Sequence, residues 1–136
     1  MQYKYISHTA DVKFKAFGRN IDAVFSNSAL AMFNILGPTN KVKSTKTKKI
    51  KVKTKSYEQL LYDFLQELLF LLDTEHFFLH KVKQIKITND FELTATLEGD
   101  NCNNYELKSD IKAVTYSDME IKKTKSGYEA TVVVDT

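Results

Sequence analysis

Apolar and polar residues alternate along the first part of the chain and predict two short strands. Residues 2–6 form the first, and in residues 12–17 apolar side chains alternate with cationic ones at a period of two. One face of the second strand should therefore pack inward while its lysines meet water. The polar stretch before it, from His8, contains one acidic residue, Asp11, which stands where the second strand begins.

Two later stretches have the spacing of amphipathic helices. The first follows Asn20, a suitable N-cap residue, and stops at residues 37–38, which are Gly-Pro. The second covers residues 57 to about 72, where Ser56 and Gln59 have the spacing of a capping box. Its apolar face is broader than one stripe. That breadth indicates either deep burial against a sheet or an extra surface for a partner.

The rest of the chain returns to strand-like alternation, with turns about residues 89–90 and 126–127. Strands are predicted at residues 49–53, 82–87, 91–97, 119–123 and 128–134. Residues 99–104 are polar and predict a mobile loop. Because helices and strands are interspersed without regular βαβ spacing, we expect one α+β domain over residues 1–136. It should hold a mixed, largely antiparallel sheet with two main amphipathic helices packed on it.

Composition narrows the class of protein. The chain has 136 residues, 43% of them hydrophobic and 27% charged, which is ordinary for a globular domain with its own core. Its densest apolar run, residues 68–72, is too short to span a membrane, and the N-terminus lacks the layout of a signal peptide. We therefore expect a cytoplasmic protein without membrane contact. The lone Cys102 excludes an internal disulfide and, without Cys or His neighbours, argues against zinc.

The charge of the chain is unevenly distributed. The net charge is +3, yet eight lysines lie within residues 41–55. Lysines that neutralise phosphates are the simplest route to nucleic-acid affinity. Against base recognition, the segment has no interleaved aromatic residues, and Arg19 is the only arginine of the chain. Either a solvated strand face or an anionic partner accounts for the segment.

Familiar catalytic patterns are missing. The sequence has no Gly-rich phosphate loop, no nucleophile elbow and no HExxH motif, which argues against an enzyme. His76 and His80 would form a metal pair only on a helix, whereas their surroundings alternate like a strand.

Asp135 is more informative, because it ends an otherwise apolar strand. If that strand lies beside the second strand, Asp11 and Asp135 converge and form an oxygen-rich pocket with the carbonyl or terminal carboxyl group of Thr136. Such ligands suit Ca²⁺, Mg²⁺ or Mn²⁺ better than zinc. Asp11 can equally shape the loop by accepting backbone hydrogen bonds.

Four segments, in this order, resemble the archease family. They are His8-Thr9-Ala10-Asp11, Leu60-Leu61 followed by Glu67-Leu68-Leu69, Ile111-Lys112-Ala113-Val114-Thr115-Tyr116, and Val133-Val134-Asp135. Together they span nearly the whole chain, which makes the resemblance specific. It implies an archease-like α+β fold and a protein cofactor, not itself an enzyme, of the RNA-splicing ligase that joins tRNA halves. Such a cofactor promotes guanylylation of the ligase by GTP and multiple turnover, acts with a divalent metal ion, and meets tRNA only through the ligase.

The resemblance also implies site residues. The metal ligands would be Asp11, Asp135 and the main chain of Thr136, and the candidate functional neighbours are His8, Thr9, Lys112 and Thr115. The chain departs from the common family pattern at four positions: Thr136 for an aliphatic residue, Phe64 for Trp, Gln66 for Asn, and Ser117 for His. An alternative function, different in class, is a chaperone-like or RNA-binding modulator of tRNA-processing or tRNA-modifying enzymes, acting through residues 41–55.

Overall fold

The computed structural model describes residues 1–6 and 11–136. Its elements follow in the order β1 (Tyr3–Ile6), β2 (Val12–Gly18), α1 (Ile21–Leu36), η1 (Thr39–Lys41), β3 (Lys46–Lys53), α2 (Tyr57–Glu75), β4 (Phe77–Ile87), β5 (Glu92–Asn101), η2 (Cys102–Asn104), β6 (Ala113–Thr124) and β7 (Gly127–Asp135). The two predicted helices and the predicted strands are all present, although several strands are longer than their apolar patterns indicate.

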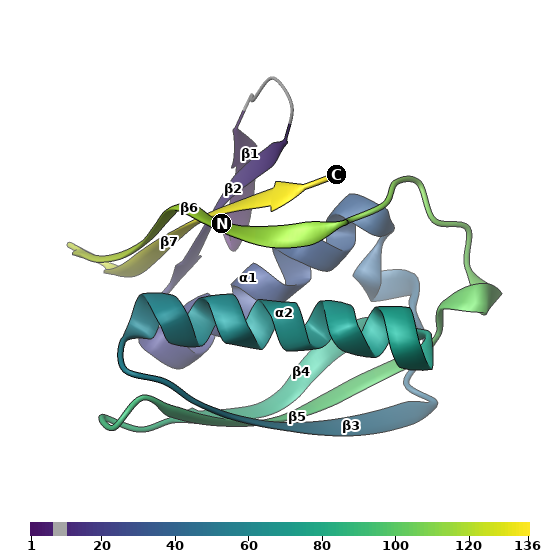
Figure 1. Cartoon of the computed structure of the whole chain (residues 1–136), viewed down its shortest axis with the longest axis horizontal. Helices are drawn as coiled ribbons and strands as arrows, with labels where there is room; N and C mark the ends of the chain where they lie inside the picture. Colours follow the sequence, from purple (N-terminus) through teal and green to yellow (C-terminus); the bar gives the residue numbers. More distant parts are fainter. Residues whose placement is uncertain (7–10) are drawn as a thin grey trace.

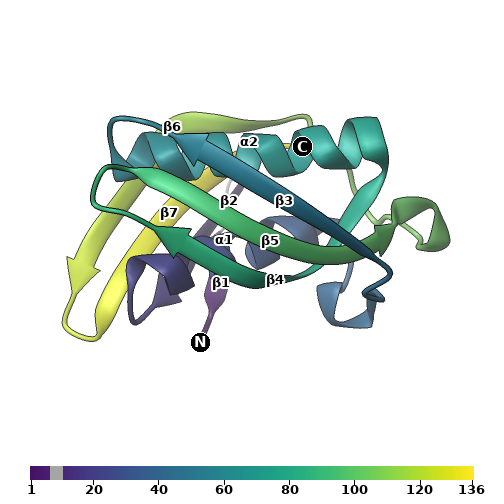
Figure 2. The same ribbon diagram turned by 90° about the horizontal axis from the view of Figure 1, so that it is seen from below.

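The described strands form two antiparallel sheets, in the orders β1-β2-β7-β6 and β3-β5-β4. Both helices lie between the sheets, so the molecule has three layers (Figure 1). Seen from below, the second sheet lies in front of the helices with its outer face uncovered (Figure 2). The predicted α+β fold with two helices on antiparallel strands is confirmed, but the strands divide into two sheets instead of one. The broad apolar face of α2 explains the division into two sheets, because a helix with such a face must be covered on both sides.

Both helix starts follow the predicted capping. The side chain of Asn20 accepts a hydrogen bond of 2.9 Å from the backbone N–H of Ala23, and that of Ser56 accepts one of 3.1 Å from Gln59. These bonds satisfy backbone donors that a helix N-terminus leaves free. The second helix continues to Glu75, three residues past the predicted end, and His76 closes it in the left-handed conformation with a φ of 56°.

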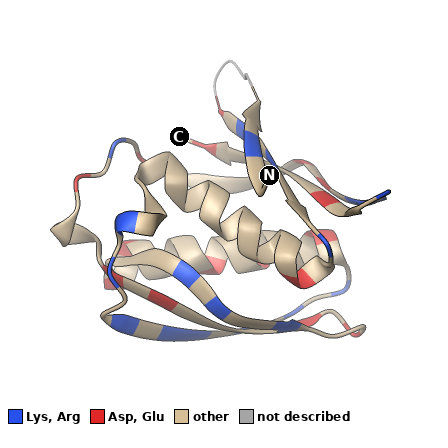
Figure 3. Cartoon of the chain, turned by 180° about the vertical axis from the view of Figure 1, so that it is seen from behind, with Lys and Arg blue, Asp and Glu red and all other residues tan. Residues whose placement is uncertain are grey.

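The lysines within the predicted stretch of β3, residues 49–53, lie as their alternation predicts. Ile50 is buried at 6% exposure, whereas Lys49, Lys51 and Lys53 are exposed on the outer face of the second sheet. In Figure 3, Lys and Arg residues, coloured blue, follow the strands of that sheet. The period of two therefore predicted the orientation of this strand correctly.

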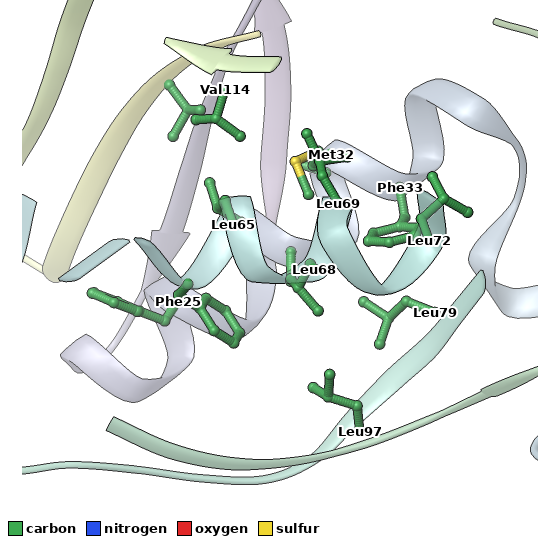
Figure 4. Packing of buried hydrophobic residues seen from close by; sticks show 14 of the residues in the cluster. Phe25, Met32, Phe33, Leu65, Leu68, Leu69, Leu72, Leu79, Leu97 and Val114 are labelled. Atoms are coloured by element: carbon green, nitrogen blue, oxygen red, sulfur yellow. The ribbon is translucent and has the colours of Figure 1, made fainter. Parts of the chain in front are cut away.

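The core is continuous through all three layers. Leu65 and Leu68 of α2 are fully buried, and they leave the helix on different sides. In Figure 4, Leu65 lies toward Val114 of the first sheet and Leu68 toward Leu97 of the second. One helix thus supplies the packing surface for both sheets, which fixes the position of the first sheet and of the strand ends it carries.

The predicted mobile loop at residues 99–104 is wrong. The strand β5 extends through Asn101, and Asp100 within it is only 5% exposed. Its carboxylate accepts hydrogen bonds from the hydroxyl groups of Thr45 and Tyr105, the latter at 2.7 Å. These bonds hold the pKa of Asp100 well below its usual range. Internal bonds that replace water explain how so polar a segment can be buried.

Candidate functional site

The first sheet brings two distant parts of the chain together. Strands β2 and β7 pair antiparallel, with Val12 opposite Val134 at one end of the ladder. Asp11 directly precedes Val12, and Asp135 directly follows Val134. The last strand therefore lies beside the second one, as the convergence of the two acids requires. The end of β7 and the start of β2 lie at the same side of the molecule (Figure 1).

Alternation along the two strands assigns both acids to one face. Phe14 on β2 and Val132 and Val134 on β7 are fully buried against the helices. Successive side chains point to opposite faces of a sheet. Asp135 and, by continuing the alternation one residue beyond β2, Asp11 therefore belong to the outer face, away from the helices. Both residues are partly exposed, so the site is open to solvent.

Two of the other predicted residues lie at the neighbouring strand β6: Lys112 directly precedes it and Thr115 is within it. The backbone N–H of Lys112 donates a 2.8 Å hydrogen bond to the carbonyl of Asp135, which ties the end of β7 to this strand. Thr115 pairs with Val133 and shares its outer face. The hydroxyl oxygen of Thr115 is buried and has no hydrogen-bond partner in the described part of the chain.

A bulge in β6 borders this outer face. Thr115 lies opposite Val133 while Glu120 lies opposite Thr131, so the ladder shifts between them. Asp118 within the bulge has a φ of 60°, and its carboxylate lies 3.7 Å from the ammonium group of Lys13 on β2. Bulges of this kind redirect side chains and are common beside functional sites.

The donors near the strand ends fit a hard cation in their chemistry. Asp11, Asp135 and the main chain of Thr136 offer only oxygen atoms, which suit Ca²⁺, Mg²⁺ or Mn²⁺. Within residues 1–6 and 11–136, no three His, Cys, Asp or Glu side chains gather into a group that could hold a metal ion. A cation here would therefore need the main chain of Thr136 as well as the two carboxylates. His8 and Thr9 lie outside the described residues.

The remaining histidines have structural roles. A ring nitrogen of His80 lies 2.9 Å from the carbonyl oxygen of Thr39, and His76 closes α2. His80 lies within β4, as the strand-like pattern of its surroundings predicts.

One contact near the site was not anticipated from the sequence. The side-chain oxygen of Gln66 on α2 accepts a 3.1 Å hydrogen bond from the backbone N–H of Val114. Beside it, the rings of Tyr62 and Tyr116 meet edge to face at 5.6 Å. These contacts fasten the central helix to the free edge of β6. The signal in the sequence that could have indicated these contacts is the pair Tyr62 and Gln66, which lie four residues apart on the flank of an apolar helix.

No helix in the described chain is both long enough and apolar enough to span a membrane.

The chain is similar to known proteins in both sequence and structure. The Archease protein family (MTH1598/TM1083) matches residues 3–136. The chain is 42% identical to a protein archease of Methanosarcina barkeri, with 98% of this chain and 95% of that protein covered. It is 34% identical to a protein archease of Methanothermobacter thermautotrophicus, with coverage of 98% and 97%.

Two solved structures have the same fold. The solution structure of protein 1598 of Methanobacterium thermoautotrophicum superposes with a TM-score of 0.84 at 33% identity, over 99% of both chains. The crystal structure of an archease of Thermotoga maritima, described as a possible chaperone, gives a TM-score of 0.63 at 21% identity over 98% and 96% of the chains. Because the family match covers almost the whole chain and relatives above 30% identity do as well, this chain belongs to the archease family.

Proposed function

We propose that this protein is an accessory cofactor, not itself a catalyst, of the RNA-splicing ligase in tRNA splicing and RNA repair. In this role it promotes GTP-dependent guanylylation of the ligase and allows multiple turnover. The observation that carries the proposal is the antiparallel register that sets Asp11 beside Asp135 on an open face. An accessory protein must present its groups to a partner, and partly exposed carboxylates at strand ends meet that need.

The chemistry assigned to the site is the binding of a divalent cation. Asp11 and Asp135 would hold it together with the main chain of Thr136, while the hydrogen bond from Lys112 keeps the end of β7 in place. When bound, such a cation would stabilise the negative charge that develops on phosphate oxygens during nucleotidyl transfer. The unpartnered hydroxyl of Thr115, two residues along the same face, provides a further oxygen near the carboxylates.

Multiple-turnover ligation by the partner ligase tests the proposal. Asp11→Asn and Asp135→Asn each remove one carboxylate charge with little change in size and should abolish the stimulation. Asp90→Asn is the matched control, because Asp90 is exposed in the β4–β5 turn and loses the same charge. Stimulation by Asp11→Asn equal to that of the wild type would exclude this site from the function.

A second candidate function, a chaperone-like role toward tRNA-processing enzymes, has one observation in its favour. Phe70 on α2 and Tyr116 on β6 are 55% and 54% exposed, and exposed aromatic side chains can bind apolar surface of another protein. The Thermotoga maritima archease is described as a possible chaperone. A holdase role predicts that Phe70→Ser weakens suppression of thermal aggregation of the ligase, while Asp11→Asn leaves it intact.

A further inference from the structure

We infer that the outer face of the second sheet binds the phosphate backbone of double-helical RNA. The feature that carries this inference is a group of six lysines, here called the cationic face, on strands β3 and β4. Its members are Lys49, Lys51, Lys53, Lys81, Lys83 and Lys86. The face lies on the opposite sheet from the acidic strand ends, so the inference does not depend on the proposed ligase function.

The charge on this face exceeds that of the molecule as a whole. The acidic side chains on the same face are Glu92 and Glu98 of β5, so the six lysines leave a net charge of about +4, compared with +3 for the entire chain. Glu92 begins β5 and Glu98 lies six residues further along the strand. Glu98 pairs with Lys81 and Lys83, both at 3.6 Å, and Glu92 lies 4.0 Å from Lys51. Between the two glutamates, the outward positions of β5 hold Thr94 and Thr96, so the centre of the face has no acidic side chain.

The centre of the face has the side chains that contact phosphates. A hollow of about 340 Å³ lies there, bordered by Lys49, Lys51 and Lys86 together with Gln84, Thr94 and Thr96. Within the described residues, neither Lys49 nor Lys86 has an ion-pair partner. Lysine, threonine and glutamine side chains all bind phosphate oxygens in nucleic-acid complexes.

The geometry of the sheet fits a long anion better than a small one. Lysines two residues apart on β3 are about 6.8 Å apart, so the row of three spans about 14 Å. The lysines of β4 form a second row about 10 Å away, with β5 between them. A nucleic-acid duplex carries one charge per about 1.7 Å of its axis, so each row would meet several phosphates at once. Figure 2 shows that no other element covers this face.

The composition of the face also favours a double helix over single-stranded nucleic acid or an apolar protein surface. Aromatic side chains are absent from the outward positions of these strands, so stacking on unpaired bases, the usual basis of single-strand binding, is not available. Large apolar side chains, which form the centre of most protein interfaces, are absent from those positions too. Double-stranded RNA is recognised mainly through its backbone and shape, which lysines and threonines on an uncovered sheet face can contact.

The test uses the whole chain without the ligase. Fluorescence anisotropy of a labelled 20-base-pair RNA duplex, recorded in about 50 mM and about 200 mM salt, should show affinity falling steeply with salt. The variant Lys49→Gln/Lys51→Gln/Lys86→Gln should bind at least tenfold more weakly at the lower salt. Its slope of log affinity against log salt should be shallower by about 2.7, because three phosphate contacts are lost.

A control of equal charge separates a local contact from general attraction. Lys4→Gln/Lys123→Gln/Lys125→Gln removes three exposed lysines elsewhere and should weaken binding less than threefold. Equal weakening by the two triple variants would overturn the inference, as would the absence of binding at the lower salt. Tighter binding to phosphatidylserine vesicles than to the duplex would reassign the face to a membrane surface. Ligase stimulation by Lys49→Gln/Lys51→Gln/Lys86→Gln is measured in a separate assay. A negative result in the duplex-binding test therefore does not contradict the proposed ligase function.

Discussion

Removal of the Asp11 carboxylate should separate metal binding from folding. In metal-free buffer, Asp11→Asn is expected to fold as well as the wild type, because residue 11 is partly exposed and directly precedes the start of β2. Directly opposed residues on antiparallel strands have Cβ atoms about 5 Å apart. At that distance in water two like charges repel by about 0.8 kcal/mol before screening by salt. Loss of one carboxylate should therefore leave stability unchanged or raise it by less than about 1 kcal/mol.

A bound cation should reverse this order of stability. At a concentration one hundred times its dissociation constant, a ligand that binds only the folded state stabilises it by about 2.7 kcal/mol. For 136 residues the entropy of unfolding is about 0.29 kcal/mol per kelvin at the midpoint. The wild type should thus melt about 9 °C higher with saturating cation than in chelator. Asp11→Asn and Asp135→Asn should show almost none of that rise.

Thermal melts followed by circular dichroism, in chelator and in graded Ca²⁺, Mg²⁺ and Mn²⁺, provide the measurement. Asp90→Asn, which removes a carboxylate from the β4–β5 turn, should keep the full cation-dependent rise. The reasoning fails if Asp11→Asn gains as many degrees as the wild type at the same concentration. It also fails if no cation raises the melting temperature of the wild type, because the donors would then not form a site.

Three further results are expected. Leu68→Ala should lower the free energy of unfolding in urea by about 2–5 kcal/mol, since this fully buried side chain packs between the sheets. Gly99→Ala should lower the melting temperature, because an added Cβ would lie 2.1 Å from the carbonyl oxygen of Phe78, and an unchanged value would contradict that close approach. The pKa of Asp100 is depressed in the folded protein, first by the hydrogen bond from Thr45. The ionised carboxylate therefore stabilises the fold above the unfolded pKa of about 3.9, and this stabilisation is lost progressively as pH falls from there through the folded pKa. Asp100→Asn should therefore lose less stability in urea between about pH 6 and about pH 3 than the wild type does.

Local patterns predicted the elements of this fold well because each pattern has a local cause. The helix starts at Asn20 and Ser56 depend on bonds to backbone groups three residues away, which sequence spacing reveals directly. The strand β3 depends on alternation alone, and Lys49, Lys51 and Lys53 lie on the predicted face. Where both the signal and its cause lie within a few residues, the sequence is sufficient.

The division into two sheets and the burial of Asp100 depend on contacts between distant segments. The turns at residues 89–90 and 126–127 predict that β5 pairs with β4 and that β7 pairs with β6, but no local pattern indicates that β5 also pairs with β3 or that β7 pairs with β2. Asp100 is satisfied by Thr45, which is 55 positions away in the chain. Polar residues 99–104 therefore resembled a solvated loop, because the partners that allow their burial are remote in sequence. The bulge of β6 has the same origin, since it is defined only against its partner strand.

The candidate site depends partly on a local pattern and partly on pairing between distant strands. Alternation along β2 is visible in the sequence, whereas Ala130 to Val134 of β7 are all buried, so the pairing with β2 sets the side to which Asp135 points. A slip of one residue between β2 and β7 would turn Val134 outward and Asp135 toward the helices, at the cost of burying a carboxylate. The apolar side chains of Val132 and Val134 therefore hold the register that sets the two acids side by side. The core of the first sheet and the chemistry at its edge are thus determined by the same pairing, so a substitution that loosens this packing would also displace the carboxylates.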